Sequence, residues 1–89
     1  MFFISLNRFR RKATKESIAE SEKLLKQAAK EGMKILGFYW TLGRFDSVLI
    51  AEWPNEKAAM KAIIRWGDLL STETLVAVPR DEAVKFLEA

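Results

Sequence analysis

The stretch GMKILGFYWTLGRFDSVLIAEW, residues 32–53, contains two runs of strand-forming residues that meet at a Leu-Gly-Arg-Phe-Asp turn. Apolar residues occupy successive as well as alternate positions of both runs. A hairpin with one face in water would instead show polar residues at every second position. We therefore expect both faces of this hairpin to be covered, one by helices of the chain and the other by a second copy.

Around the hairpin the sequence predicts the order β-α-β-β-α-β with a short helix after it. The outer strands are expected over residues 2–7 and 72–78, one helix from Thr14 to Gly32, a second from Pro54 to Gly67, and a terminal helix over 80–87. Ser17 with Glu20 offers an alternative start for the first helix. Right-handed crossovers turn this order into a four-stranded antiparallel sheet with both long helices on one face. The predicted fold class is therefore α+β and ferredoxin-like.

The chain of 89 residues contains neither cysteine nor histidine and has a formal net charge of +3. It therefore lacks disulfides, thiolate nucleophiles and any imidazole that could act as a general base or haem ligand. Catalysis would have to depend on Asp, Glu, Tyr, Lys or Arg. We expect one domain over residues 1–89, with no metal and no cofactor. No apolar run approaches the roughly 20 residues of a membrane span, so a cytoplasmic protein without a membrane partner is expected.

Five basic residues gather between the first strand and the first helix: Arg8, Arg10, Arg11, Lys12 and Lys15. Such a segment can attract phosphates or nucleic acid. The third strand, however, lacks the aromatic signature with which RNA-recognition domains of this topology stack bases. We expect a solvated loop that binds nucleic acid weakly at most.

Four residues of the hairpin are candidates for binding a ligand: Tyr39, Thr41, Asp46 and Glu52. Asp46 could accept hydrogen bonds from the amides of the turn, a structural role, or act as a general base. Glu52 lies between apolar neighbours, where its pKa could be raised, but it could equally reach solvent or pair with a cation. Four others are candidates for a contact between two copies packed sheet to sheet: Phe38, Trp40, Val48 and Ile50.

The segment GFYWTLGRFD at residues 37–46 resembles the GYD domain family, as does TETL at 72–75 followed by Pro79. The turn that names the family corresponds to Gly43, Arg44, Phe45 and Asp46, with Phe45 where the family has tyrosine. The resemblance implies a ferredoxin-like fold and kinship with dimeric α+β-barrel proteins. It implies no established reaction.

Three functions remain open from the sequence. The first is a small homo-oligomeric binding or regulatory module that holds an apolar or aromatic ligand near Tyr39, Thr41 and Asp46. The second is a cofactor-free enzyme, in which Trp40 and Glu52 would join Tyr39 and Asp46 in orienting an aromatic substrate. The third is nucleic-acid binding through the basic segment.

Overall fold

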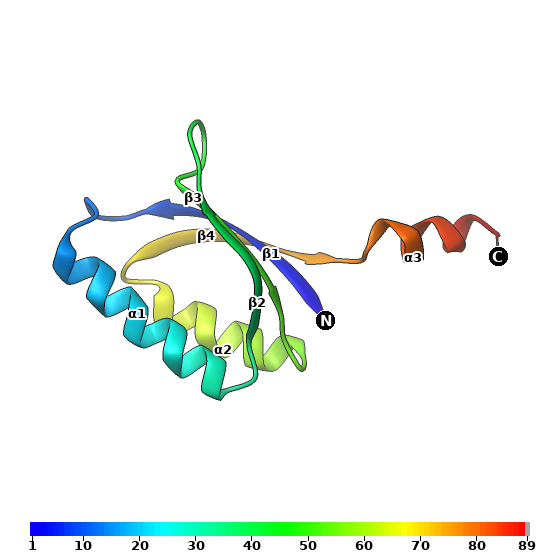
Figure 1. The fold of residues 1–89 in the computed structure, drawn as a ribbon, viewed down its shortest axis with the longest axis horizontal. Coiled ribbons are helices and arrows are strands. Elements are labelled where there is room, and N and C mark those ends of the chain that lie inside the picture. Colours follow the sequence, from blue (N-terminus) through cyan, green and yellow to red (C-terminus); the bar gives the residue numbers. More distant parts are fainter. Residues whose placement is uncertain (89) are drawn as a thin grey trace.

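The structure, a computed structural model, describes residues 1–88 and has the predicted element order (Figure 1). The elements are β1 (Phe2–Phe9), α1 (Lys15–Lys30), β2 (Lys34–Trp40), β3 (Ser47–Glu52), α2 (Glu56–Trp66), β4 (Leu70–Ala77), α3 (Arg80–Lys85) and the 3₁₀ turn η1 (Phe86–Glu88). The strands form one antiparallel sheet in the order β2-β3-β1-β4. Helices α1 and α2 cover one face of it (Figure 1). The ferredoxin-like prediction is confirmed.

The central strand β1 places its polar residues toward the helices. Ser5 and Asn7 are buried together with Phe3. The aliphatic residues that alternate with them, Ile4 and Leu6, face the open side of the sheet and are only half-buried. Residues 2–7 of β1 lie opposite residues of β3, and residues opposite one another share a face of the sheet. The open face is therefore the more apolar face of this strand.

A β-bulge interrupts the alternation of β2. Ile35 lies opposite Ala51 on the side of the helices, but Gly37 lies opposite Ile50 on the open face. Strict alternation along the strand would place Ile35 and Gly37 on the same face, and it does not hold here. The extra residue, Leu36, shifts the register by one, so every following side chain of β2 changes face.

Helix α1 begins at the predicted cap, Thr14. Thr14 accepts a hydrogen bond from the Ser17 amide, and the Ser17 hydroxyl bonds back to the Thr14 amide, which makes Ser17 part of this capping box and not a separate start. Asn55 caps α2 through the Ala58 amide. Gly67 is the C-cap of α2, as expected, with a right-handed φ of −58°.

The core lies between the helices and the sheet. Its buried apolar residues are Phe3, Ala28, Met33, Leu49, Ala51, Trp53, Ala59, Ala62 and Trp66. Alanines on both helices let their backbones approach, and the larger residues of the sheet and of α2 fill the space beside them. Burial of this apolar set is the main source of stability, at about 25 cal/mol for each Å² removed from water.

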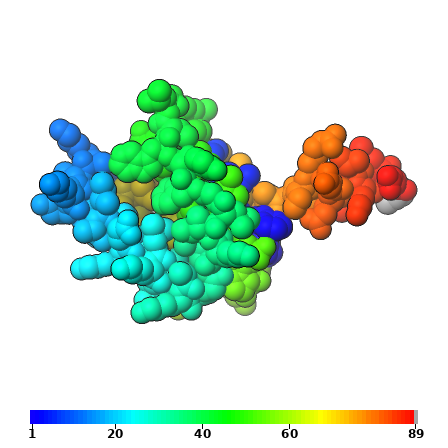
Figure 2. Space-filling model, viewed as in Figure 1, coloured from blue at the N-terminus to red at the C-terminus, as the bar shows by residue number. Residues whose placement is uncertain are grey.

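Helix α3 projects away from the rest of the molecule (Figures 1 and 2). No residue of α3 or η1 is buried, and Leu87 is 87% exposed. The molecule is elongated as a result, with principal extents of 50 × 31 × 18 Å. The sequence predicted this helix, and the structure adds that it is an arm whose apolar residues, including Phe86, lie in solvent.

Two glycines have positive φ, but only one of them is crowded. Gly32, at the end of α1, has φ +105°, and a Cβ there would lie 2.6 Å from Pro54 Cγ. Gly43, in the β2–β3 turn, has φ +102° with nothing within 4 Å of that position. We expect Gly43→Ala to cost about 1–2 kcal/mol from backbone strain alone. Gly32→Ala adds a clash and should cost roughly 2–5 kcal/mol. Urea denaturation measures both, and equal losses would contradict this account.

Glu31 joins the two helices through two cations. Arg65 donates two hydrogen bonds to its carboxylate, and Lys61 Nζ lies 3.5 Å from Oε2. Hydrogen bonding from Arg65 is the largest cause that lowers the pKa of Glu31 below its ordinary 4.5, while partial burial opposes it.

A lowered pKa in the folded state means stability that is present above pH 4.5 and lost as the pH falls through the folded value. We therefore expect Glu31→Gln to be less stable than the wild type at neutral pH. The difference should narrow as urea denaturation is repeated at pH values below 4.5. A difference that does not depend on pH would argue against the charge of Glu31 as its source.

Candidate functional site

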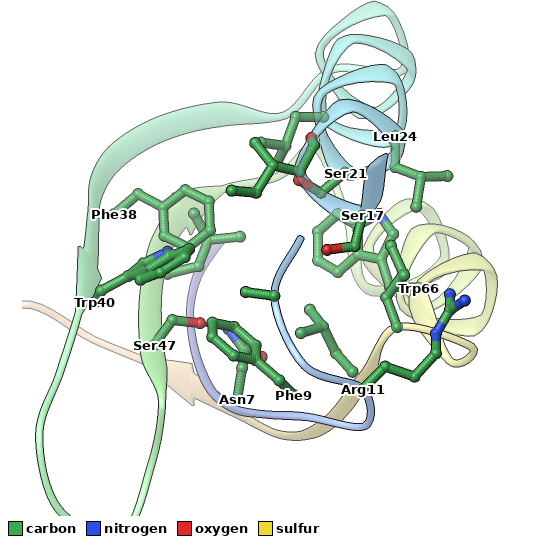
Figure 3. Close-up of a pocket in the computed structure, with 16 residues that line it drawn as sticks. Asn7, Phe9, Arg11, Ser17, Ser21, Leu24, Phe38, Trp40, Ser47 and Trp66 are labelled. Carbon is green, nitrogen blue, oxygen red and sulfur yellow. Dashed lines mark hydrogen bonds between the residues drawn. The ribbon is translucent and has the colours of Figure 1, made fainter. Parts of the chain in front are cut away.

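A cavity of about 90 Å³ opens between the sheet and the helices. It lies where β1 and β2 end and α1 begins, and Figure 3 shows side chains from both layers surrounding an empty centre. The lining residues are Asn7, Phe9, Arg11, Ala13, Ser17, Ile18, Ser21, Leu24, Leu25, Phe38, Trp40, Ser47, Leu49, Trp66, Leu69 and Leu70. Most of these are aliphatic or aromatic, as in sites for small molecules.

Ionisable side chains are almost absent from the lining of the cavity. Arg11 is the one ionisable side chain among its lining residues, and it forms an exposed ion pair with Glu20 at 3.6 Å. The hydroxyls of Ser17 and Ser21 donate to carbonyls of their own helix, to Thr14 O and Ile18 O. A substrate in this cavity would therefore meet no carboxylate that could act as a general acid or base.

Asn7 and Ser47 form a polar pair on the sheet side of the cavity (Figure 3). They lie opposite each other on β1 and β3, and Asn7 Nδ2 donates to Ser47 Oγ at 3.1 Å. Each is only 1% exposed. Among residues 1–88, Asn7 Oδ1 has no hydrogen-bond partner, although a buried amide oxygen without a partner costs roughly 1–3 kcal/mol.

An aromatic pair flanks this polar pair. Phe9 follows Asn7 on the same face of β1, and Trp40 lies opposite Ser47 on β2. The two rings meet edge to face with their centroids 5.1 Å apart. Trp40 is 63% exposed, so this aromatic pair lies toward the mouth of the cavity and the polar pair lies deeper.

The four candidates for a contact between copies do not share one face. Phe38 lies opposite Leu49 and Trp40 opposite Ser47, so both face the helices and line the cavity. Val48 and Ile50 lie on the open face. Phe38 and Trp40 are therefore corrected from interface candidates to cavity residues.

Three of the four predicted ligand residues hold the β2–β3 turn or lie outside the cavity. Tyr39 is on the open face, opposite Val48. The Thr41 hydroxyl donates to Phe45 O at 2.7 Å. Asp46 Oδ2 accepts from the Phe9 amide at 2.8 Å, so its partner lies on β1 and not among the turn amides. Tyr39, Thr41 and Asp46 are not among the residues that line the cavity.

Glu52, the fourth predicted ligand residue, lies at the opposite end of β3 from Ser47. It is opposite Phe2 on one side and Lys34 on the other, on the open face. The structure therefore does not bring Glu52 together with Tyr39 and Asp46, as the hypothesis of an enzyme required.

The Gly43–Asp46 turn is held by cations that stack on Phe45. The guanidinium carbons of Arg8 and Arg44 lie 5.6 and 5.5 Å from its ring centroid, and Arg8 Nε donates to Arg44 O. Aromatic faces attract cations, so the phenylalanine in this position performs this packing without a hydroxyl.

The basic segment is partly tied to its own chain. Arg8 bonds to the β2–β3 turn, Arg10 Nε donates to Leu70 O at 3.2 Å, and Arg11 pairs with Glu20. Lys12 and Lys15 are exposed. The described residues contain no cluster of three or more His, Cys, Asp or Glu suited to a metal ion, and none of their helices is long and apolar enough to cross a membrane.

Sequence reasoning missed Asn7, Phe9 and Ser47. Asn7 follows Ser5 at a spacing of two, which in isolation indicates a polar face turned to water. The signal that could have found Asn7 is the alternation itself. Ile4 and Leu6 form an equally regular apolar face, so either face of this strand could have been the one turned to the helices.

Comparison of the sequence with models of known protein families identifies the GYD domain. The model of the GYD domain matches residues 3–87, nearly the whole chain. No curated protein matches.

Proposed function

The chain belongs to the GYD domain family, and we propose that it is a homo-oligomeric module that binds a small apolar or aromatic molecule between its sheet and its helices. The observation that carries this proposal is the apolar cavity with the polar pair Asn7–Ser47 in its wall. Small-molecule sites combine an apolar concave lining with a few polar groups that fix orientation.

Binding fits this cavity better than catalysis does. Arg11 is its one ionisable lining residue, and it is paired with Glu20 at the surface. The carboxylates that an enzyme acting here would use, Asp46 and Glu52, are bonded to a backbone amide or lie at the other end of β3. For the basic segment we keep the expectation of weak, salt-sensitive binding of nucleic acid at most.

Filling the cavity should abolish binding. Ser21 lines the cavity and its hydroxyl bonds only within α1, so Ser21→Phe should place a ring in the empty space. Toluene serves as the probe, and binding is followed by the indole N–H signals of Trp40 and Trp66 in NMR spectra. Trp53, which does not line the cavity, is the internal reference.

The matched control is Glu22→Phe, which adds the same ring at the next, exposed position of the helix. We expect toluene to shift the signals of the wild type and of Glu22→Phe and to leave those of Ser21→Phe unchanged. Undiminished binding to Ser21→Phe would place the toluene site elsewhere.

For the homo-oligomer, we propose that the open faces of two sheets pack together. Large apolar side chains cover the central strands on this face: Phe2, Ile4, Leu6, Val48 and Ile50. Soluble monomers rarely expose a large contiguous apolar patch. The arm formed by α3 extends beyond the body directly after β4, so a second copy on this face also offers the arm a partner (Figure 1).

Light scattering should give the mass of a dimer at low micromolar concentration. Ile50→Lys should reduce it to that of a monomer, because a charge in an apolar contact is unpaired and costly. Trp40→Lys should keep the mass of the wild type, since Trp40 faces the helices. A wild-type mass equal to one chain, or dissociation by Trp40→Lys alone, would contradict the proposed face.

A further inference from the structure

We propose that the ligand is a small aromatic acid, whose ring enters the cavity while its carboxylate stays at the mouth and binds Arg11. The inference rests on the proposed function and adds the chemical class of the ligand. Its basis is the position of Arg11 at the edge of an otherwise apolar cavity, on the side away from Trp40 (Figure 3). Among residues 1–88 it is the one ionisable residue of the lining.

The interior of the cavity offers no partner to a charged group. Its wall is mainly aliphatic and aromatic, and the hydroxyls of Ser17 and Ser21 donate to carbonyls of their own helix. Asn7 and Ser47 are only 1% exposed, and their side chains bond to each other. A charge without a partner in such surroundings is costly, so the ionised group of a ligand has to remain at the mouth.

Arg11 is available to bind an anion there. Its side chain is 58% exposed, and its ion pair with Glu20 joins two exposed groups at 3.6 Å. Such a pair contributes little to stability, because water and salt screen it. A ligand carboxylate can therefore replace Glu20 as the partner of the guanidinium, whose planar set of N–H donors matches the two carboxylate oxygens.

The charges beside the mouth favour an anion over a cation. Residues 8–20, which lead from the end of β1 into α1, contain five Lys or Arg and two Glu. Arg10 is held next to the lining, since its Nε donates to the carbonyl oxygen of Leu70. The turn at residues 43–46 adds one charge of each sign. The local field is therefore positive and attracts anions.

Aromatic residues specify the apolar part of the ligand. Phe9, Phe38, Trp40 and Trp66 line the cavity, and Figure 3 shows their side chains around its empty centre. A ring in this space would contact aromatic edges and faces, which favours an aromatic ligand. The small volume, about 90 Å³, favours one ring over an extended molecule.

Benzoate, benzamide and benzamidine test this inference, because they have nearly the same shape and carry a negative charge, no charge and a positive charge. Each is titrated at neutral pH against the indole signals of Trp40 and Trp66, with Trp53 as the reference. We expect the wild type to bind benzoate roughly three- to fivefold tighter than benzamide, and benzamidine most weakly. About 0.5 M NaCl should remove most of this preference, because salt screens an exposed pair.

Arg11→Gln should make the Kd of benzoate equal to that of benzamide, because it removes the charge and keeps a polar side chain. Glu20→Gln should increase the preference for benzoate, since it removes the carboxylate that competes for Arg11. Both residues are exposed, so both variants should fold. The matched control is Lys12→Gln, which removes the same charge at the next residue, outside the lining, and should keep most of the preference.

The outcomes separate the two proposals. Equal Kd values of benzoate and benzamide in the wild type, a preference that persists in Arg11→Gln, no gain in Glu20→Gln, or an equal loss in Lys12→Gln would overturn the inference. The binding cavity still stands in those cases if toluene shifts the signals of Trp40 and Trp66. If neither toluene nor the three probes shift them, the proposed function fails and the inference fails with it.

Discussion

Strand β1 is the element on which the rest of the structure depends, because two of its polar side chains are buried beside Phe3 while aliphatic side chains occupy its opposite face. Ser5 and Asn7 lie beneath the helices, while Ile4 and Leu6 occupy the open face. A single sheet packed on one helical layer would gain most by the opposite arrangement, since about 25 cal/mol is gained for each Å² of apolar surface removed from water. Ser5 and Asn7 bond to Thr74 and Ser47 within the sheet, so the apolar open face is the part of this arrangement that gains most from a cover. A second copy of the chain is the cover that we propose for this face.

The turn that characterises the family contributes to the cavity from a distance. Asp46 accepts from the Phe9 amide through its carboxylate, and its own amide donates to Asn7 O at 2.7 Å. Both bonds fix the end of β1, where Asn7 and Phe9 line the cavity. Arg8, between them, reaches back to the turn and stacks on Phe45. The aspartate therefore acts as a positioning group for cavity residues, and the ligand that we propose need not touch it.

Helix caps, turn glycines and apolar alternation sufficed to predict the helices and strands of this fold. The cavity depends instead on contacts between elements, which these local patterns do not describe. Thr14, Gly32 and Gly43 act where the sequence placed them, because caps and turns depend on a few neighbouring residues. The bulge at Leu36 was not predictable in this way. Gly37 beyond it leaves room for the Tyr39 ring, since a Cβ there would lie 2.9 Å from Tyr39 Cε2, and this contact exists only in the folded strand. The missed bulge reversed the faces assigned to Phe38 and Trp40, and with them the position of the predicted site. The cavity had no sequence signal at all, because empty space is a property of packing between elements.

The two proposed contacts use the same strands but different side chains. Alternation along β1 and β3 sends Asn7 and Ser47 to one face and Leu6 and Val48 to the other, within a single layer of backbone. Ligand binding and association are therefore chemically separable, because a substitution on one face leaves the other side chains in place. They remain linked in energy. A domain of this size buries only about 60% of the surface that its unfolded chain exposes, so its stability margin is small. Any molecule that binds only the folded state, whether ligand or second copy, stabilises the same sheet and so favours the other contact.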